Sequence, residues 1–190
     1  MELNYYFPTV IGRFYKPKLR DKMLPLVKEV LKDEKILTYE WGYKNTYNVK
    51  GLEELPEFKD FSNFLKQIGY DYLNKLGYSS RGELVPNIFA SGMESGDSHP
   101  RHAHPGSELS GVFYLDCPEG SSDILFHDSR IIHDCRSTLR KEKENIITSN
   151  SINISPQNGL FLIWESWINH EVLLNKSNSP RTTLVFNLGL

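Results

Sequence analysis

The feature that most constrains the fold is a series of short β-rich runs in the second part of the chain. From Glu83 onward, stretches of branched and aromatic residues are separated by turns rich in glycine, proline, asparagine and serine. This spacing predicts an antiparallel sandwich or barrel rather than a parallel α/β sheet. We expect strands over residues 84–90, 109–116, 122–127, 146–154, 159–164, 170–174 and 181–188.

The first eighty residues have a helical pattern instead. Apolar residues at three- and four-residue spacing predict an amphipathic helix over residues 18–32, and Pro25 places its regular start near Met23. A second helix begins at Pro56 and has Gly77 well placed as its C-cap. We therefore expect a helical cover and a separate β-rich core.

The length of 190 residues suits a single domain with a sizeable core. We expect one domain over residues 1–190, in which residues 1–80 form the helical cover and residues 81–190 the core. The predicted fold class is mainly β: a double-stranded β-helix (a jelly roll, cupin-like), with the N-terminal helices packed outside.

Composition excludes several classes of function. A formal net charge of −2 gives no general attraction to nucleic acid or to anionic membranes. The sequence has neither an apolar run of about 20 residues, which a membrane span needs, nor a glycine-rich phosphate loop. Cys117 and Cys135, without a visible signal peptide, favour reduced thiols in a cytoplasmic protein. We expect no nucleic-acid or membrane partner.

The most specific chemical pattern is a pair of histidines, His102 and His104, with His170 far downstream. Side chains two residues apart on an extended segment point the same way, so this pair can converge on one ion. Proline and glycine on both sides predict that residues 98–108 form a loop entering the next strand. Because histidine is the commonest metal ligand, His170 arriving from a distant strand would complete a three-histidine metal site.

Arg181 follows a polar segment that predicts a hairpin turn between two strands. The predicted register pairs Val172 with Thr183 and His170 with Val185, which places His170, Arg181 and Thr183 on one face. Four residues along a strand separate His170 from Arg181 by about 13 Å, a gap that the long arginine side chain shortens to the span of a small dicarboxylate. The guanidinium fork suits a bidentate carboxylate contact, and an inward arginine is costly without an anion.

These segments, residues 101–115, 156–159, 170–172 and 181–187, resemble the 2-oxoglutarate and iron(II)-dependent oxygenases. In particular they resemble a small, prolyl-hydroxylase-like branch from marine bacteria and their phages, as do residues 7–9 and 41–46. The resemblance covers most of the chain. It adds the expectation that the protein is phage-encoded and acts in the host cytosol.

The resemblance implies a double-stranded β-helix that holds one Fe(II), chelated by 2-oxoglutarate, with O2 as co-substrate. The reaction would hydroxylate a small-molecule or peptidyl substrate and release succinate and CO2. Carried over by position, His102 and His170 are iron ligands and Arg181 holds the distal carboxylate of 2-oxoglutarate. Thr183 assists Arg181, and Tyr114 is a further contact to the cosubstrate. No catalytic residue beyond the metal ligands is implied.

The departure from the family pattern is His104, which stands where an aspartate is expected in a two-histidine, one-carboxylate triad. A third neutral imidazole leaves more positive charge on the metal. That charge would strengthen the binding of an anionic cosubstrate or change the preferred metal. We take the three histidines as the ligand set, with Asp97, Glu108 and Asp128 as the carboxylates that could replace His104.

Two other functions fit parts of this pattern. A cupin-type metal enzyme that does not use 2-oxoglutarate would take Glu108 as a fourth ligand, but it has no general need for Arg181. A non-catalytic β-sandwich binding module would leave the histidines incidental or give them a closed structural metal. Neither alternative predicts succinate from 2-oxoglutarate.

Overall fold

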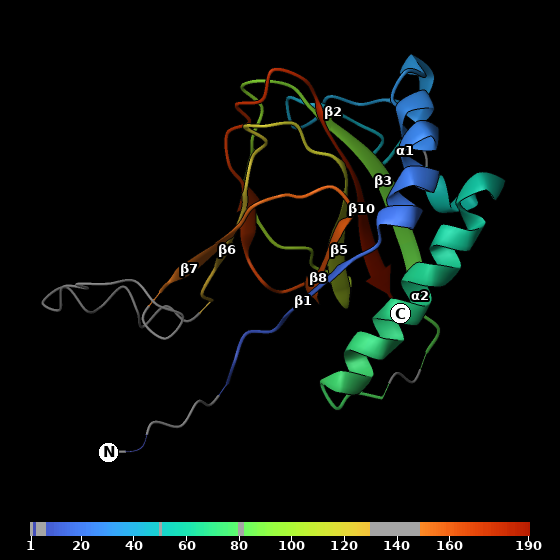
Figure 1. Ribbon diagram of the computed structural model, residues 1–190. Helices are drawn as coiled ribbons and strands as arrows, with labels where there is room; N and C mark the ends of the chain where they lie inside the picture. Colours follow the sequence, from blue (N-terminus) through green and yellow to red (C-terminus); the bar gives the residue numbers. More distant parts are fainter. Residues whose placement is uncertain (1, 3–6, 50, 80–81, 130–148) are drawn as a thin grey trace, which may run out of the picture.

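The computed structural model describes residues 2, 7–49, 51–79, 82–129 and 149–190 (Figure 1). In this part of the chain the strands form two antiparallel sheets. The major sheet has the order β1-β8-β5-β10-β3-β2 and the minor sheet the order β4-β9-β6-β7. The bounds are β1 (Ile11–Tyr15), β2 (Lys44–Asn45), β3 (Val85–Met93), β4 (His99–His102), β5 (Leu109–Asp116), β6 (Ile124–His127), β7 (Ser151–Ile154), β8 (Leu160–Glu165), β9 (His170–Val172) and β10 (Arg181–Gly189).

Successive side chains along each strand point to opposite faces of the major sheet, so its two faces carry different sets of residues. On β10, Leu184, Phe186 and Leu188 belong to the core beneath the helices. Arg181, Thr183 and Val185 alternate with them and line a cavity on the opposite face. The sheet therefore has a structural face and a functional face.

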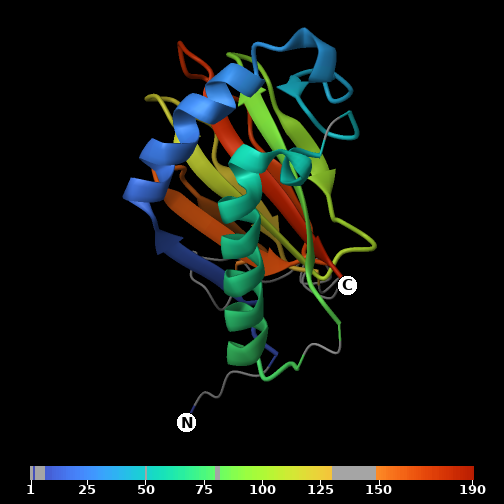
Figure 2. The same cartoon turned by 90° about the vertical axis from the view of Figure 1, so that its right-hand side faces the viewer.

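Helices α1 (Pro17–Val30) and α2 (Lys59–Lys75) cover the structural face (Figure 2). Met23 and Val27 of α1 and Phe61 and Leu65 of α2 are buried in the core that this face shares with the helices. Short 3-10 helices lie before α2, at η1 (Glu34–Ile36), η2 (Leu52–Glu54) and η3 (Pro56–Phe58). The two sheets and their helical cover form the predicted double-stranded β-helix, mainly β with helices outside.

The predicted start of the first helix near Met23 was wrong, because α1 begins at Pro17. Pro17 lies in the first turn, where the amide hydrogen that proline lacks has no intrahelical partner. Pro25 lies inside the helix and removes one backbone hydrogen bond there. We attribute its tolerance to the burial of Met23 and Val27, which holds this turn against the sheet.

Gly77 ends the second helix as predicted. Its φ of +84° is left-handed, and Tyr78 N donates to Leu73 O over 2.9 Å, as expected of a helix C-cap. β5 has the predicted bounds. Residues 146–148 of the strand predicted over 146–154, and Cys135, lie outside the described residues. The first eighty residues also supply strands, since β1 and β2 form the two edges of the major sheet.

The predicted hairpin between β9 and β10 was wrong, because these strands lie in different sheets. The connection is tied to the β3–β4 turn through Asn175, whose Nδ2 donates to Met93 O over 2.9 Å and to Glu94 O over 3.0 Å. Its Oδ1 accepts from Ser122 N over 3.1 Å. These bonds direct the chain across from one sheet to the other, and the turn-like composition of the segment does not reveal their partners.

The loop predicted over residues 98–108 contains the short strand β4, which has an irregular register. His99 pairs with Val172 and His102 with His170, so β4 advances three residues while β9 advances two. An extra residue of this kind is a β-bulge, and it turns side chains that would face opposite ways toward the same side. His99 and His102 therefore both line the cavity.

No helix in the described ranges is long and apolar enough to cross a lipid bilayer.

Candidate metal and cosubstrate site

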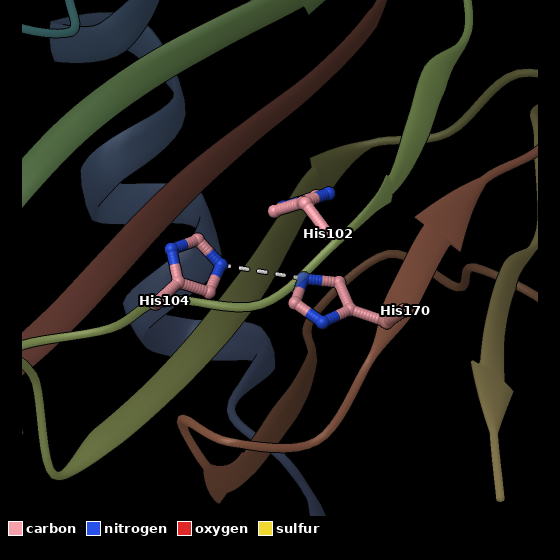
Figure 3. Close-up of side chains that lie close together, drawn as sticks. All are labelled: His102, His104 and His170. Carbon is pink, nitrogen blue, oxygen red and sulfur yellow. Dashed lines mark hydrogen bonds between the residues drawn. The ribbon is translucent and has the colours of Figure 1, made fainter. Parts of the chain in front are cut away.

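His102, His104 and His170 converge between the two sheets (Figure 3). One ring nitrogen from each lies within 4.8 Å of the others, and His104 Nε2 is 3.3 Å from His170 Nε2. Two imidazole nitrogens bound at right angles about 2.1 Å from one ion lie about 3 Å apart. The spacing of these two nitrogens therefore suits neighbouring positions on a single metal.

Backbone carbonyls fix the orientation of two of the three rings. His102 Nδ1 is 2.8 Å from Pro100 O, and His170 Nδ1 is 3.0 Å from Ile168 O. A carbonyl only accepts, so each Nδ1 carries the hydrogen and each Nε2 keeps its lone pair. Metal-binding histidines commonly use this arrangement.

The protonation of the three histidines also favours metal binding. Burial lowers the pKa of His170 to about 4, with a further contribution from His102. Burial and the neighbouring His170 lower the pKa of His104 to about 3, and burial lowers the pKa of His102. The imidazoles are therefore neutral at pH 7, which is the form that coordinates a metal.

The histidines come from neighbouring parts of the fold. His102 ends β4, and His170 begins β9 opposite it. His104 follows β4, and its backbone N donates to Ser166 O over 3.0 Å, which ties this loop to the segment before β9. The convergence predicted from the His-x-His spacing and the distant histidine is present in the structure.

The alternative carboxylates do not join this group. Among the residues that the structure describes, the cluster capable of holding a metal consists of histidines alone. The Asp97 carboxylate accepts from Glu94 N over 2.7 Å within the β3–β4 turn. Neither Glu108 nor Asp128 belongs to the cluster.

Arg181 lies in the same cavity, and its guanidinium has few partners. The residue is 3% exposed, and Nη1 donates to the Met93 sulfur over 3.1 Å. Its Nε has no hydrogen-bond partner in the described part of the chain. A buried guanidinium with open donors requires an anion, so this end of the cavity suits a carboxylate.

The residues predicted to assist Arg181 lie beside it. Thr183 lines the cavity on the same face of β10. The Arg181 guanidinium carbon lies 5.0 Å from the centre of the Tyr114 ring, whose hydroxyl is buried without a partner among the described residues. Burial raises the pKa of Tyr114, so the phenol keeps its proton and remains a donor. Tyr114 is fully buried and is not among the residues that line the cavity, so Arg181 and Thr183 are the groups that this end of the site presents.

The cavity that joins these residues has a volume of about 270 Å³. Its lining includes the three histidines, Arg181 and Thr183, and also side chains that the sequence did not indicate as site residues, among them three large aromatic residues and a fourth histidine. These are Trp41, Tyr43, Tyr47 and His99. Only the position of His99 three residues before His102, and the resemblance over residues 41–46, could have indicated them.

The donor set fits Fe(II) with a chelating dicarboxylate. Three neutral imidazoles on one side of an ion leave other positions open for oxygen ligands, and imidazole suits iron. Arg181 supplies the cation for the far carboxylate. The fold and the site thus define a β-helix with a cluster of three histidines that could hold one metal ion.

The sequence places the chain in a family with this architecture. Residues 87–187 match the family model described as "Putative 2OG-Fe(II) oxygenase", which spans more than half of the chain. The chain belongs to this family and is a 2-oxoglutarate and Fe(II)-dependent oxygenase, an oxidoreductase with these two cofactors. Membership supports the oxygenase over the two other functions considered from the sequence. None of the curated proteins compared with the chain matches it.

Solved structures share the fold at low sequence identity. A prolyl-4-hydroxylase from Pseudomonas putida has a TM-score of 0.63 and 12% identity, over 95% of this chain and 92% of the hydroxylase. The epimerase SnoN, from nogalamycin biosynthesis, was solved with Fe3+, alpha ketoglutarate and nogalamycin RO. Its TM-score is 0.68 at 10% identity, over 95% of this chain and 79% of SnoN.

An oxidoreductase of the 2OG-Fe(II) oxygenase family from Burkholderia pseudomallei gives a TM-score of 0.51 at 16% identity. The match covers 81% of this chain and 66% of that protein, so this chain spans just under two thirds of its length.

Proposed function

We propose that the enzyme hydroxylates a small-molecule or peptidyl substrate, with His102, His104 and His170 as the iron ligands. Arg181 is proposed to hold the distal carboxylate of 2-oxoglutarate, assisted by Thr183 and Tyr114. When bound, Fe(II) and 2-oxoglutarate supply the oxidising chemistry: substrate C–H, 2-oxoglutarate and O2 become substrate C–OH, succinate and CO2.

The chain's own residues bind and orient in this reaction. His102 and His170 present lone pairs on Nε2 because their Nδ1 atoms donate to Pro100 O and Ile168 O. Arg181 lines the cavity, its buried Nε has no partner among the described residues, and Thr183 lines the cavity on the same strand face. Tyr114 keeps its hydroxyl protonated, and its ring lies against the Arg181 guanidinium.

Water exclusion is the second contribution of the protein. Val112, Ile124 and Trp164 line the cavity, and all three are buried. Burial of the site strengthens the charge-assisted contacts that hold the dicarboxylate, because the local dielectric is low.

The observation that carries the proposal is one cavity that holds both a cluster of three neutral histidines and a buried arginine with an unpartnered Nε. A structural metal would explain the histidines but leave Arg181 without a purpose. A dicarboxylate anchored at both ends explains the two features together.

The test is anaerobic addition of Fe(II) and 2-oxoglutarate to the protein. We expect a visible metal-to-ligand charge-transfer band at one equivalent of iron, followed in air by release of succinate when candidate substrates are screened. Protein that binds iron without this band, and that never forms succinate, would contradict the proposal.

We also propose that the enzyme acts in a cytosol, either bacterial or phage-infected. The support is the free Cys117 thiol, whose pKa is raised by burial to about 11, so it is poorly reactive.

A further inference from the structure

An aromatic wall closes one side of the cavity, and neither the metal nor the cosubstrate accounts for it. We define the aromatic wall as Trp41, Tyr43, Tyr47, Phe89 and His99, all of which line the cavity. Trp41 is its centre, with ring centroids 4.6 Å from Tyr47, 4.8 Å from His99 and 6.3 Å from Phe89.

The backbone holds this wall in place. Asn45 Nδ2 donates to Tyr43 O over 2.9 Å, and Asn45 Oδ1 accepts from Tyr47 N over 3.0 Å. Thr46 bonds Ala90 of β3 twice: its N donates to Ala90 O and its Oγ1 accepts from Ala90 N, each over 3.1 Å. The rings therefore sit on a fixed extension of the major sheet.

The wall reaches the metal ligands through His99. The His99 ring lies 4.2 Å from the His102 ring, centre to centre, and His99 Nδ1 shares a hydrogen bond of 2.9 Å with the Tyr43 hydroxyl. Trp41 and Tyr47 are only partly buried, so their rings keep surface free for a ligand. The Trp41 ring contacts the His99 ring, which in turn contacts the ring of His102, a proposed iron ligand. A molecule resting on Trp41 would therefore be separated from this ligand by two ring contacts.

The charges in the cavity give neither a cation nor an anion a net advantage at this wall. Arg181 is the one charged side chain among the described residues that line the cavity. With three neutral histidines, Fe(II), Arg181 and doubly charged 2-oxoglutarate leave a net charge of about +1, which disfavours a cation. The aromatic faces are themselves negative, so they attract a cation and disfavour an anion. For either sign of charge the metal centre and the ring faces therefore act against each other, whereas an uncharged ring meets no such opposition.

The space in the cavity limits the size of the ligand. Its volume of about 270 Å³ lies at the small end of ligand cavities, which span roughly 300–1,000 Å³, and 2-oxoglutarate must occupy part of it. The enclosed part of the substrate is therefore no larger than a single ring. Flat side chains give a cyclic group more contact than a branched chain.

We propose that the aromatic wall is the substrate-binding face and that the reacting part of the substrate is an uncharged ring packed against Trp41 and Tyr47. The inference rests on the proposed function, because the loaded metal centre supplies the charge that offsets the attraction of the ring faces for cations. It makes Trp41 and Tyr47 specificity-determining residues.

Three probes with the same ring and different charges test the inference: cyclohexylmethanol, cyclohexylmethylammonium and cyclohexanecarboxylate. Each is titrated into the anaerobic protein loaded with Fe(II) and 2-oxoglutarate. Binding is followed by the change in the visible absorption band and by saturation-transfer NMR. We expect the alcohol to bind at least tenfold more tightly than either charged probe. Equal or tighter binding of a charged probe would overturn the inference.

Variants locate the binding face. Trp41→Leu and Tyr47→Leu keep apolar volume but remove a flat ring. Each should raise the Kd for the alcohol about fivefold or more. Trp167→Leu is the matched control, since Trp167 is 52% exposed and outside the cavity lining. This variant should leave the Kd for the alcohol unchanged. Unchanged binding in both wall variants would overturn the inference even if the absorption band forms normally.

The two proposals fail in different ways. If Fe(II) and 2-oxoglutarate produce no band in the wild type, the proposed function is wrong, and the inference falls with it. If the band forms and the probes show no preference for the neutral ring, the inference alone is wrong. The comparison among probes uses the wild-type protein, so it does not depend on the folding of any variant.

Discussion

Arg181 is the residue whose burial most needs a ligand, because a guanidinium that is 3% exposed leaves its Nε without a partner. Replacing it by lysine keeps the charge but removes the planar fork. We expect Arg181→Lys to raise the Kd for 2-oxoglutarate by about 10- to 100-fold, the loss of about 1.4–3 kcal/mol of charge-assisted hydrogen bonding. Iron affinity should change little.

Anaerobic isothermal titration calorimetry checks both constants, with Fe(II) titrated into the metal-free protein and 2-oxoglutarate into the iron-loaded protein. Arg13→Lys is the control, since Arg13 is exposed on β1 and outside the cavity lining. A 2-oxoglutarate affinity that is equal in wild type and Arg181→Lys would remove the clamp from the proposal.

His104 determines the charge of the proposed metal centre. His104→Asp would restore the common two-histidine, one-carboxylate set, and so add one negative charge next to the cosubstrate. We expect this variant to keep one equivalent of iron and to bind 2-oxoglutarate about tenfold more weakly, because like charges a few ångströms apart repel. Metal analysis and calorimetry give the two values, and tighter binding of 2-oxoglutarate would refute the charge argument.

The buried histidines make the metal-free protein sensitive to acid. The pKa falls to about 4 for His99 and His170 and to about 3 for His104, whereas an unfolded histidine titrates near 6.5. Between pH 6.5 and about 4 the unfolded chain therefore binds more protons than the folded one. Stability is fully present above pH 6.5 and is lost as the pH falls through this window.

We expect the Tm of the protein in a chelator to be several degrees lower at pH 5 than at pH 7.5, since about 1 kcal/mol corresponds to 2–4 °C at this size. Differential scanning calorimetry measures the shift. His104→Gln, which removes one titrating group, should flatten the dependence. A Tm that is constant or higher at pH 5 would show that the histidines titrate normally.

At the scale of the elements, Gly111 of β5 lies where three strands meet closely. A Cβ at this position would lie 2.6 Å from Leu162 O of β8 and would also contact the Phe186 ring of β10. We expect Gly111→Ala to destabilise the protein by about 1–3 kcal/mol, the typical result of overpacking, as measured by urea unfolding.

Gly92→Ala is the matched control on β3, where the nearest atom, Leu31 Cδ1, lies at an ordinary 3.4 Å. This change should alter the free energy of unfolding by less than about 1 kcal/mol. Equal effects at both glycines would mean that the contact with Leu162 and Phe186 relaxes freely.

Elements with a strong local pattern could be predicted from the sequence. The bounds of β5 and the cap of α2 at Gly77 follow from composition and turn chemistry close by in the chain. The convergence of His102 and His104 with His170 was also predictable, because it depends on spacing and on the existence of one further strand.

Features that depend on distant partners were not predictable. The β-bulge of β4 exists only against β9, and it is what brings His99 to the cavity. The crossover between β9 and β10 depends on Asn175 bonding to Met93 and Glu94, more than eighty residues earlier. Trp41 joins the site because β2 pairs with the edge of β3. A strand of two residues has no recognisable sequence pattern, so this pairing could not be predicted.

On the scale of the whole molecule, the two sheets supply different halves of the site. His102 and His170 belong to the minor sheet, whereas Arg181 and Thr183 belong to the major sheet. A dicarboxylate that joins the metal to Arg181 would therefore connect the sheets. Metal alone should stabilise the minor sheet and the loop after β4 that carries His104.

We expect Fe(II) and 2-oxoglutarate together to raise the Tm more than Fe(II) alone under anaerobic conditions. Each ligand at about 100 times its Kd adds about 2.7 kcal/mol, or roughly 5–11 °C at this size. Arg181→Met should lose the increment from 2-oxoglutarate but keep the one from iron, and His170→Ala should lose both. An increment from 2-oxoglutarate that survives in Arg181→Met would contradict the bridging arrangement.

The central place of β10 in the major sheet has a consequence for biosynthesis. Its two neighbours, β3 and β5, are both translated before it, yet they bond to β10 and not to each other. Until β10 emerges from the ribosome, β3 and β5 each have one edge without a neighbouring strand. Unpaired strand edges can pair with other chains. The nascent protein would thus depend most on chaperone protection just before the strand that carries Arg181 is made.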